Sequence, residues 1–260
     1  MTAELEGGDG AGRGPLNYGS YLALDDLLAL QRPMSEPEHP DELLFIVVHQ
    51  ASELWFKAIL HELDTLVAAM ERDDMSGAVF VTKRLNALVR IVTGQLSALD
   101  TLPPHRFAQF RGYLGSSSGS QSAQFRAIEA ASGLRETHFL NALAEHGEPP
   151  AVVTRWLERP TLQELFDGVL ARRGTTYGAL YDDPEQSPLL LLAESLLEYE
   201  QGFGLWRFLH VQLVERIIGP DTGGTGGTLG ARYLQRTISQ RFFPKLWAVR
   251  SRYFREPGAG

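Results

Sequence analysis

The sequence contains no cysteine among its 260 residues. This absence excludes disulfide bonds, thiolate ligands to a metal or haem, and the covalent Cys-x-x-Cys-His attachment of haem. Any metal or haem that the protein binds must therefore be held by histidine, carboxylate or tyrosine side chains.

An excess of positive charge is also missing. The formal net charge is -8, and the lysines and arginines are scattered among acidic residues. Without a basic field to attract phosphates, nucleic acid is not expected as a partner. The hydrophobic content of 43% is nevertheless high enough to build a sizeable core.

Long apolar runs are absent as well. The most apolar stretch, residues 188–197, is too short to cross a bilayer and is followed at once by Glu198 and Glu200. Residues 1–15 are rich in glycine and lack the apolar segment of a signal peptide. We expect a cytoplasmic protein with no membrane segment, with a flexible tail over residues 1–15 and one helical domain over residues 16–260.

Helical periodicity dominates the chain. Over residues 41–72, polar side chains recur at helical spacing among apolar ones, which predicts one long helix. Residues 77–102 predict a second helix that ends before Pro103 and packs antiparallel to the first across a short turn. The fold class expected is therefore all-α, a helical bundle without a convincing strand.

The remaining segments predict shorter helices around one further long one. Ser118 and Gln121 have the spacing of a capping box in a Ser/Gly-rich turn. The expected elements are a short segment at 105–114, a helix to about residue 131, two or three short helices within 133–186, a long helix at 188–218, and a C-terminal helix at about 230–250.

His210 lies among Phe203, Trp206, Leu213 and other apolar residues at helical spacing, so its imidazole belongs to an apolar helix face. Two readings stay open. It is either a core histidine hydrogen-bonded to a backbone carbonyl or an axial ligand of haem iron, and spacing does not decide between them.

His49 and Phe45 are one helical turn apart and point into the same space. His49 is either part of a pocket wall or a partly solvated surface histidine, because it also belongs to the polar stripe. The spacing from His49 to Glu53 permits a metal site, but the second histidine of a His-Glu-x-x-His zinc motif is missing.

Arg111 follows Phe107 and Phe110 between a proline pair and a glycine turn, where an arginine fork can reach a ligand carboxylate. A surface salt bridge is the alternative. The Gly-rich loop 223–228 lacks the ending of a phosphate-binding loop. It is either simply flexible or orders over a substrate.

Several blocks of sequence are informative together because they occur in one order. They are 16–22 (LNYGSYL), 45–57 (FIVVHQASELWFK), 107–126 (FAQFRGYLGSSSGSQSAQFR), 205–210 (LWRFLH) and 224–227 (GTGG). In this order they resemble the tryptophan 2,3-dioxygenase family along most of the chain, and such agreement is highly specific.

The resemblance implies a non-covalent haem b, active as Fe²⁺, with His210 as the proximal ligand of the iron and with Trp206 and Ser118 beside the cofactor. O2 would be the co-substrate. His49 would bind the indole nitrogen on the distal side and take part in catalysis, and Phe45 and Phe107 would line the indole pocket.

The resemblance also implies partners for the carboxylate and ammonium groups of the substrate. Arg111 would pair with its carboxylate, and Thr225 would hold its ammonium group with help from a haem propionate. Tyr18, Tyr21 and Leu22 match residues that family members lend to a neighbouring subunit, which implies a homotetramer, a dimer of dimers.

The implied reaction is the oxidative opening of the indole ring of L-tryptophan, or of a close derivative, to N-formylkynurenine or its counterpart. Ser120 stands where the family usually has phenylalanine, Thr228 and Leu229 replace the usual serines, and the middle of the chain is shortened. Two alternatives stay open: a monooxygenase that converts a substituted tryptophan such as β-methyltryptophan to an oxindole, and a non-catalytic haem sensor or carrier.

Overall fold

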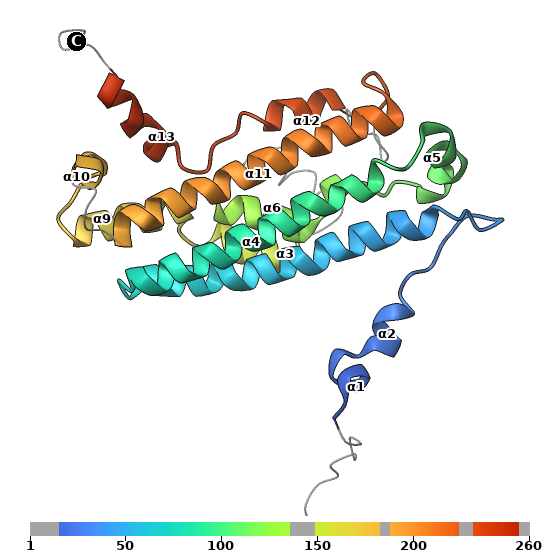
Figure 1. Ribbon diagram of the computed structural model, residues 1–260, viewed down its shortest axis with the longest axis horizontal. Helices are drawn as coiled ribbons and strands as arrows, with labels where there is room; N and C mark the ends of the chain where they lie inside the picture. The colour runs from blue at the N-terminus through green and yellow to red at the C-terminus, as the bar shows by residue number, and fades with distance from the viewer. Residues whose placement is uncertain (1–15, 136–148, 183–187, 224–230, 255–260) are drawn as a thin grey trace, which may run out of the picture.

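The computed structural model describes residues 16–135, 149–182, 188–223 and 231–254, and within them it contains helices and no strand (Figure 1). The prediction of an all-α fold is thus confirmed. The α-helices are α1 (Tyr18–Leu22), α2 (Leu24–Leu28), α3 (Glu42–Glu71), α4 (Met75–Leu99), α5 (Pro104–Arg111), α6 (Ala123–Ala131), α8 (Ala151–Leu157), α9 (Leu162–Arg172), α10 (Tyr177–Asp182), α11 (Pro188–Ile218), α12 (Ala231–Thr237) and α13 (Pro244–Arg250). Short 3-10 turns are η1 (Gly112–Leu114), η2 (Gly119–Gln121) and η5 (Ser251–Phe254).

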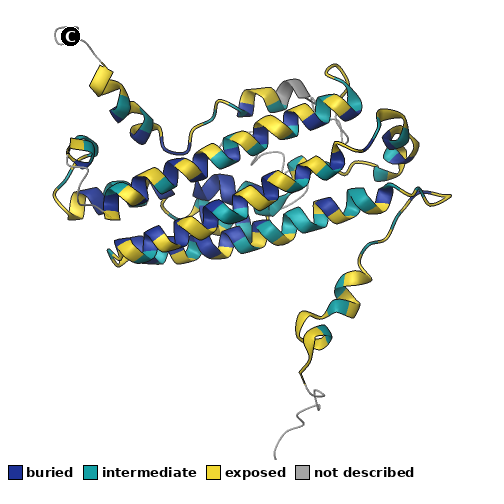
Figure 2. Cartoon of the chain, in the orientation of Figure 1, coloured by how far each residue is buried: buried dark blue, intermediate teal, exposed yellow. Residues whose placement is uncertain are grey.

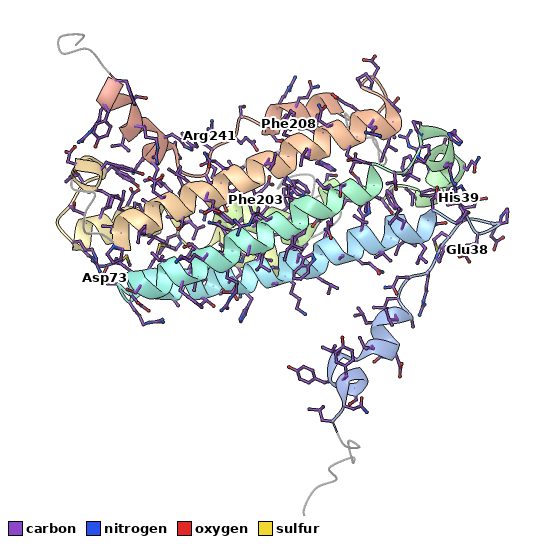
Figure 3. The ribbon with its side chains drawn as sticks, in the orientation of Figure 1. Glu38, His39, Asp73, Phe203, Phe208 and Arg241 are labelled. Atoms are coloured by element: carbon purple, nitrogen blue, oxygen red, sulfur yellow. The ribbon has the colours of Figure 1, made fainter. Side chains whose placement is uncertain are left out.

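Three long helices, α3, α4 and α11, form the body of the molecule, and α4 packs against both of the others (Figure 1). Their buried faces turn towards one another and towards α6 (Figure 2). Asp73 marks the α3–α4 turn at one end of the bundle, and His39 marks the approach to α3 at the other (Figure 3). The predicted antiparallel pair of long helices is confirmed.

The α3–α4 turn is set by local chemistry. Asp74 caps α4 by accepting a hydrogen bond from the backbone N–H of Gly77 at 2.9 Å. A Cβ atom at residue 77 would lie 2.2 Å from Oδ2 of Asp74, so glycine is what lets the cap approach. The helix begins at Met75, two residues before the position expected from the sequence.

Close packing of α4 on α11 also depends on a glycine. A Cβ atom at Gly202 would lie 2.7 Å from Cγ1 of Val89, so the two helices approach where α11 has no side chain. The Asn86 side chain donates to the backbone oxygen of Ser195 at 3.1 Å, which fixes the helices along their length. Together these contacts fix α11 along α4.

The expected C-terminal helix over residues 230–250 is wrong as a single element. It is two helices, α12 and α13, separated by residues 238–243. Phe242 and Phe243 are buried in this break and donate their backbone N–H groups to Glu200 of α11. Pro244 then starts α13, because proline needs no helical acceptor at a first position.

The N-terminal helices α1 and α2 extend away from the bundle (Figure 1). Tyr18 and Tyr21 are 76% and 71% exposed, and no residue of α1 is buried. The arm is tied to the bundle at its base, where Glu42 accepts hydrogen bonds from the backbone and side chain of Ser35. The expected tail, residues 1–15, lies outside the described residues.

By length and composition alone, α3 is apolar enough to cross a membrane. In the structure it packs along α4 and α6. It also carries Glu62 and Asp64, which pair with Arg84 of α4 and with Arg159, respectively. These contacts hold the second half of α3 in the bundle, and 22% of its most apolar stretch is buried.

Candidate active site

A cavity of about 820 Å³ lies between the long helices at the end of the bundle near α5. Its size is in the range typical of sites for small molecules and cofactors. The lining comes from α3, α4, α5, the Ser/Gly turn, α6, α11 and α12, with Leu27 and Leu30 from the arm. The site residues predicted from sequence that line it are Phe45, His49, Phe107, Arg111, Ser118, Trp206 and His210.

His210 lines the cavity from α11 and stacks on Trp206, with ring centroids 5.0 Å apart and planes 12° from parallel. Burial, together with the nearby His49, lowers the pKa of His210 to about 4. Its imidazole is therefore neutral at physiological pH. Within the described part of the chain it forms no hydrogen bond, so the reading as a carbonyl-bonded core histidine finds no support there.

His49 lines the same cavity from α3, and its exposed surface borders this space. Its Nδ1 lies 2.7 Å from the backbone oxygen of Phe45. A carbonyl oxygen only accepts, so Nδ1 carries the proton, and in the neutral ring Nε2 is left as an acceptor. Burial lowers the pKa of His49, against the opposing effects of the Phe45 carbonyl and Glu53, so the neutral form is favoured.

An aromatic group forms the wall beside His49. The centroid of the Phe45 ring lies 4.1 Å from that of His49, 5.6 Å from that of Phe107 and 5.8 Å from that of Phe110. Leu96 and Leu99 of α4 pack with the same apolar cluster. This end of the cavity is therefore aromatic and apolar.

Arg111 closes the α5 side of the cavity. Its Nη2 donates to the backbone oxygen of Gly223 at 2.6 Å. Among the described residues it has no carboxylate partner, so a surface salt bridge is not what holds it there. A guanidinium group has five N–H donors, and those not used by Gly223 can bind an anion. Thr225 lies outside the described residues.

The Ser/Gly turn forms another part of the lining. The predicted capping box of Ser118 and Gln121 is present, although it caps the short turn η2 and not α6, which Ser122 caps instead. Ser120 lines the cavity, and its hydroxyl donates to Oγ of Ser118 at 3.0 Å. A small side chain thus lines the cavity at residue 120, where the family usually has phenylalanine.

Tyr18, Tyr21 and Leu22 do not line the cavity of their own chain. All three are exposed on the arm. Sequence reasoning also missed a buried charged group in the lining, formed by Arg126, Glu129 and Arg207. Its only sequence signal was an arginine on the helix face that carries His210.

The lining suits haem on structural grounds. His210 is neutral and lines the cavity, so a ring nitrogen is available to an iron ion there. Nε1 of Trp206 is buried without an acceptor in the same part of the structure, so a donor is available for a carboxylate of the cofactor. The described residues contain no cluster of three or more metal-ligating side chains.

These features define a helical protein with a large, mostly apolar cavity that is lined by His49 and His210 from two long helices and by Arg111. The chain belongs to the tryptophan 2,3-dioxygenase family, whose sequence profile matches residues 4–147 and 166–253. It is 42% identical to the tryptophan 2,3-dioxygenase of Kineococcus radiotolerans, over 91% of each chain. Similar enzymes of Saccharopolyspora erythraea and Anaeromyxobacter dehalogenans are 39% and 40% identical, over 92% and 90% of this chain and 93% and 95% of theirs.

Proposed function

We propose that the protein is a haem-dependent dioxygenase that inserts both atoms of O2 into the indole ring of L-tryptophan and forms N-formylkynurenine. The observation that carries the proposal is the pair of histidines lining one cavity. His210 has no hydrogen bond among the described residues, and His49 has a fixed tautomer with Nε2 free to accept. Membership of the family supports the same reaction.

Haem b would be held by His210 on its proximal side, with Trp206 and Ser118 beside it. When bound, ferrous haem supplies the activation of O2. The apolar lining from α3, α4 and α5 keeps water away from the reacting groups.

His49 would orient the indole ring. The indole N–H is only a donor, and Nε2 of His49 is an acceptor because Nδ1 is committed to the Phe45 carbonyl. Phe45 and Phe107 would hold the ring by apolar contact from one side. These residues together would thus fix the orientation and the position of the indole ring in the cavity.

Arg111→Ala is expected to weaken tryptophan binding by about 2–3 kcal/mol, because the substrate carboxylate would lose a charged hydrogen-bond partner. Equilibrium titration of the haem spectrum measures the affinity. Arg106→Ala is the matched control, since Arg106 lies on the same helix but pairs with Asp41. Tryptamine lacks the carboxylate, and equal binding of tryptamine and tryptophan to the unchanged protein would contradict the clamp.

The exposed arm supports a proposal about assembly. Tyr18, Tyr21 and Leu22 would complete the site of a neighbouring subunit in a homotetramer, since they lie away from the cavity of their own chain. Thr225 would hold the ammonium group of the substrate. We also propose a cytoplasmic location. Light scattering on the purified protein gives the oligomeric state.

A second candidate function follows from Ser120. This small residue lines the cavity, which leaves room for a substituent on the substrate or for a shifted ring. Monooxygenation of a substituted tryptophan, for example one methylated at the β carbon, to an oxindole is therefore the alternative reaction. The reduced protein should be assayed in air with tryptophan and β-methyltryptophan, and the product masses distinguish one added oxygen atom from two.

Ser120→Phe is expected to shift kcat/KM towards unsubstituted tryptophan by roughly tenfold or more relative to β-methyltryptophan, because a methyl group in a filled pocket costs about 1–3 kcal/mol. Ser116→Phe is the control, since Ser116 does not line the cavity. An unchanged ratio would remove Ser120 from substrate selection. If haem binds and neither substrate turns over, the carrier function is favoured instead.

A further inference from the structure

Part of the N-terminal arm lines the cavity of its own chain. Leu27 of α2 and Leu30, which follows this helix, are both lining residues. Leu30 is 56% exposed, and Leu54 of α3, which also lines the cavity, is 52% exposed. Lining residues that also face solvent border an opening, so the arm forms one edge of a cavity mouth beside α3. We call residues 27–31 the strap.

Two glutamine side chains hold the strap on α3. Nε2 of Gln50 donates to the backbone oxygen of Leu30 at 3.1 Å. Oε1 of Gln50 accepts from Nε2 of Gln31 at 2.5 Å. The same nitrogen of Gln31 donates to the backbone oxygen of Leu27 at 3.1 Å. Gln50 thus binds the strap through both polar atoms of its amide group.

The helix that leads into the strap is too short to be stable alone. α2 has five residues, and all of them are exposed or half-buried (Figure 2). Isolated helices shorter than about 12 residues are marginal in water, so α2 depends on contacts with other parts of the chain. The hydrogen bonds between Gln31 and Gln50 and from Gln50 to Leu30 supply such contacts at the edge of the cavity.

Gln50 is also close in sequence to the proposed substrate site. It follows His49 directly on α3, and both residues line the cavity. His49 would bind the indole nitrogen from this helix, whereas Arg111 would bind the carboxylate from α5. The strap is therefore held on the helix that would orient the indole ring, and its leucine side chains add apolar surface to the lining there.

We propose that Gln50 is a positioning residue: it holds the strap so that Leu27 and Leu30 narrow the cavity mouth and slow the release of tryptophan. This inference rests on the proposed function. For the strap to open, the hydrogen bonds from Gln31 and to Leu30 must break, and release of the substrate then follows opening. The alternative is that the two glutamines only tether the arm to the bundle.

Stopped-flow measurement of tryptophan release from the haem-loaded protein, read from the haem absorption, tests the proposal. Gln50→Leu and Gln31→Leu are each expected to speed release about tenfold, because each removes hydrogen bonds that close the strap. KM should rise and kcat should not fall, since the residues that would bind haem and orient the indole are unchanged. Gln31 is not among the described lining residues, so its variant leaves the cavity wall intact.

Arg32→Leu is the matched control for Gln31→Leu. Arg32 is the next residue, and its Nε donates to the backbone oxygen of Ala29 within the arm at 3.2 Å. That variant should release tryptophan at the rate of the unchanged protein. Equal acceleration in Arg32→Leu and Gln31→Leu would overturn the proposal, because it would assign the effect to general loosening of the arm.

Leu30→Ala tests whether Gln50 acts through the strap. This variant keeps the backbone oxygen that Gln50 binds but removes most of the leucine side chain, so release should again be faster. If Gln50 acts by positioning Leu30, the double variant with Gln50→Leu should release tryptophan no faster than Gln50→Leu alone. Multiplied effects in the double variant would contradict a role through the strap.

Hydrogen exchange of the haem-free protein tests the strap without any ligand. The backbone N–H groups of Leu27, Ala29 and Leu30 donate to oxygens within the arm, and they should exchange faster in Gln50→Leu and Gln31→Leu. Unchanged exchange, or faster exchange with unchanged release of tryptophan, would overturn the proposal. Failure of the unchanged protein to bind tryptophan would instead contradict the proposed function, and the exchange measurement does not depend on that binding.

Discussion

His210→Ala is expected to abolish the Soret absorption of the purified protein while leaving its helical content unchanged. With no cysteine in the sequence, the iron ligand must come from another side chain, and His210 is the neutral imidazole without a hydrogen bond among the described residues. Alanine is well tolerated within a helix, so α11 should form in the variant. Reconstitution with haem, followed by absorption and far-ultraviolet circular dichroism, measures both quantities.

His49→Ala is the matched control for this experiment. His49 lines the same cavity, but it belongs to the opposite helix, and its Nδ1 is bonded to the Phe45 carbonyl. We expect that variant to keep its haem and to lose turnover. Undiminished haem loading in His210→Ala, or loss of haem only in His49→Ala, would show that His210 is not the proximal ligand.

Glu200→Ala is expected to lower the free energy of unfolding by about 3–5 kcal/mol, the range for removing one partner of a buried charged group. Glu200 is 2% exposed and accepts from the backbone N–H groups of Phe242 and Phe243 at 2.8 and 2.7 Å, from Trp247 Nε1 at 2.5 Å and from Arg241 at 3.2 Å. The variant leaves the buried backbone N–H groups of Phe242 and Phe243 without their acceptor. Urea unfolding of the haem-free protein measures the change.

Glu198→Ala is the control for Glu200, because it lies two residues away on the same helix. Glu198 pairs with Arg90 at 2.7 Å, but the two side chains are 55% and 64% exposed, so the loss should stay below about 1 kcal/mol. Glu200→Gln keeps the volume of the side chain and should fall between the two. Similar losses in Glu198→Ala and Glu200→Ala would show that burial of the carboxylate does not matter.

The long helices were predictable because each carries a periodic pattern over many turns. The expected helix at 188–218 is α11 itself, and the expected helix at 41–72 differs from α3 by one residue at each end. The C-terminal helix was predicted wrongly because its break depends on Glu200, which lies far away in sequence. The local sequence pattern of a segment does not indicate a partner that lies so far away along the chain.

The candidate site shows the same division. Spacing alone placed His210 on an apolar face but left two readings open, and the choice between them depends on which atoms surround the ring. Arg207 was visible in the sequence, but its ion pair with Glu129 joins residues 78 positions apart. Only packing of α6 against the rest of the bundle brings the charges together.

The cavity is assembled from segments spread between Leu27 and Thr237, which has a consequence for how the chain folds. The α3–α4 hairpin makes local contacts and can form early, whereas the wall that carries His210 joins only after α11 has been synthesised. During synthesis a helical hairpin therefore emerges from the ribosome well before any complete binding pocket exists. Cofactor capture is consequently a late event, and it favours the fully folded chain by mass action.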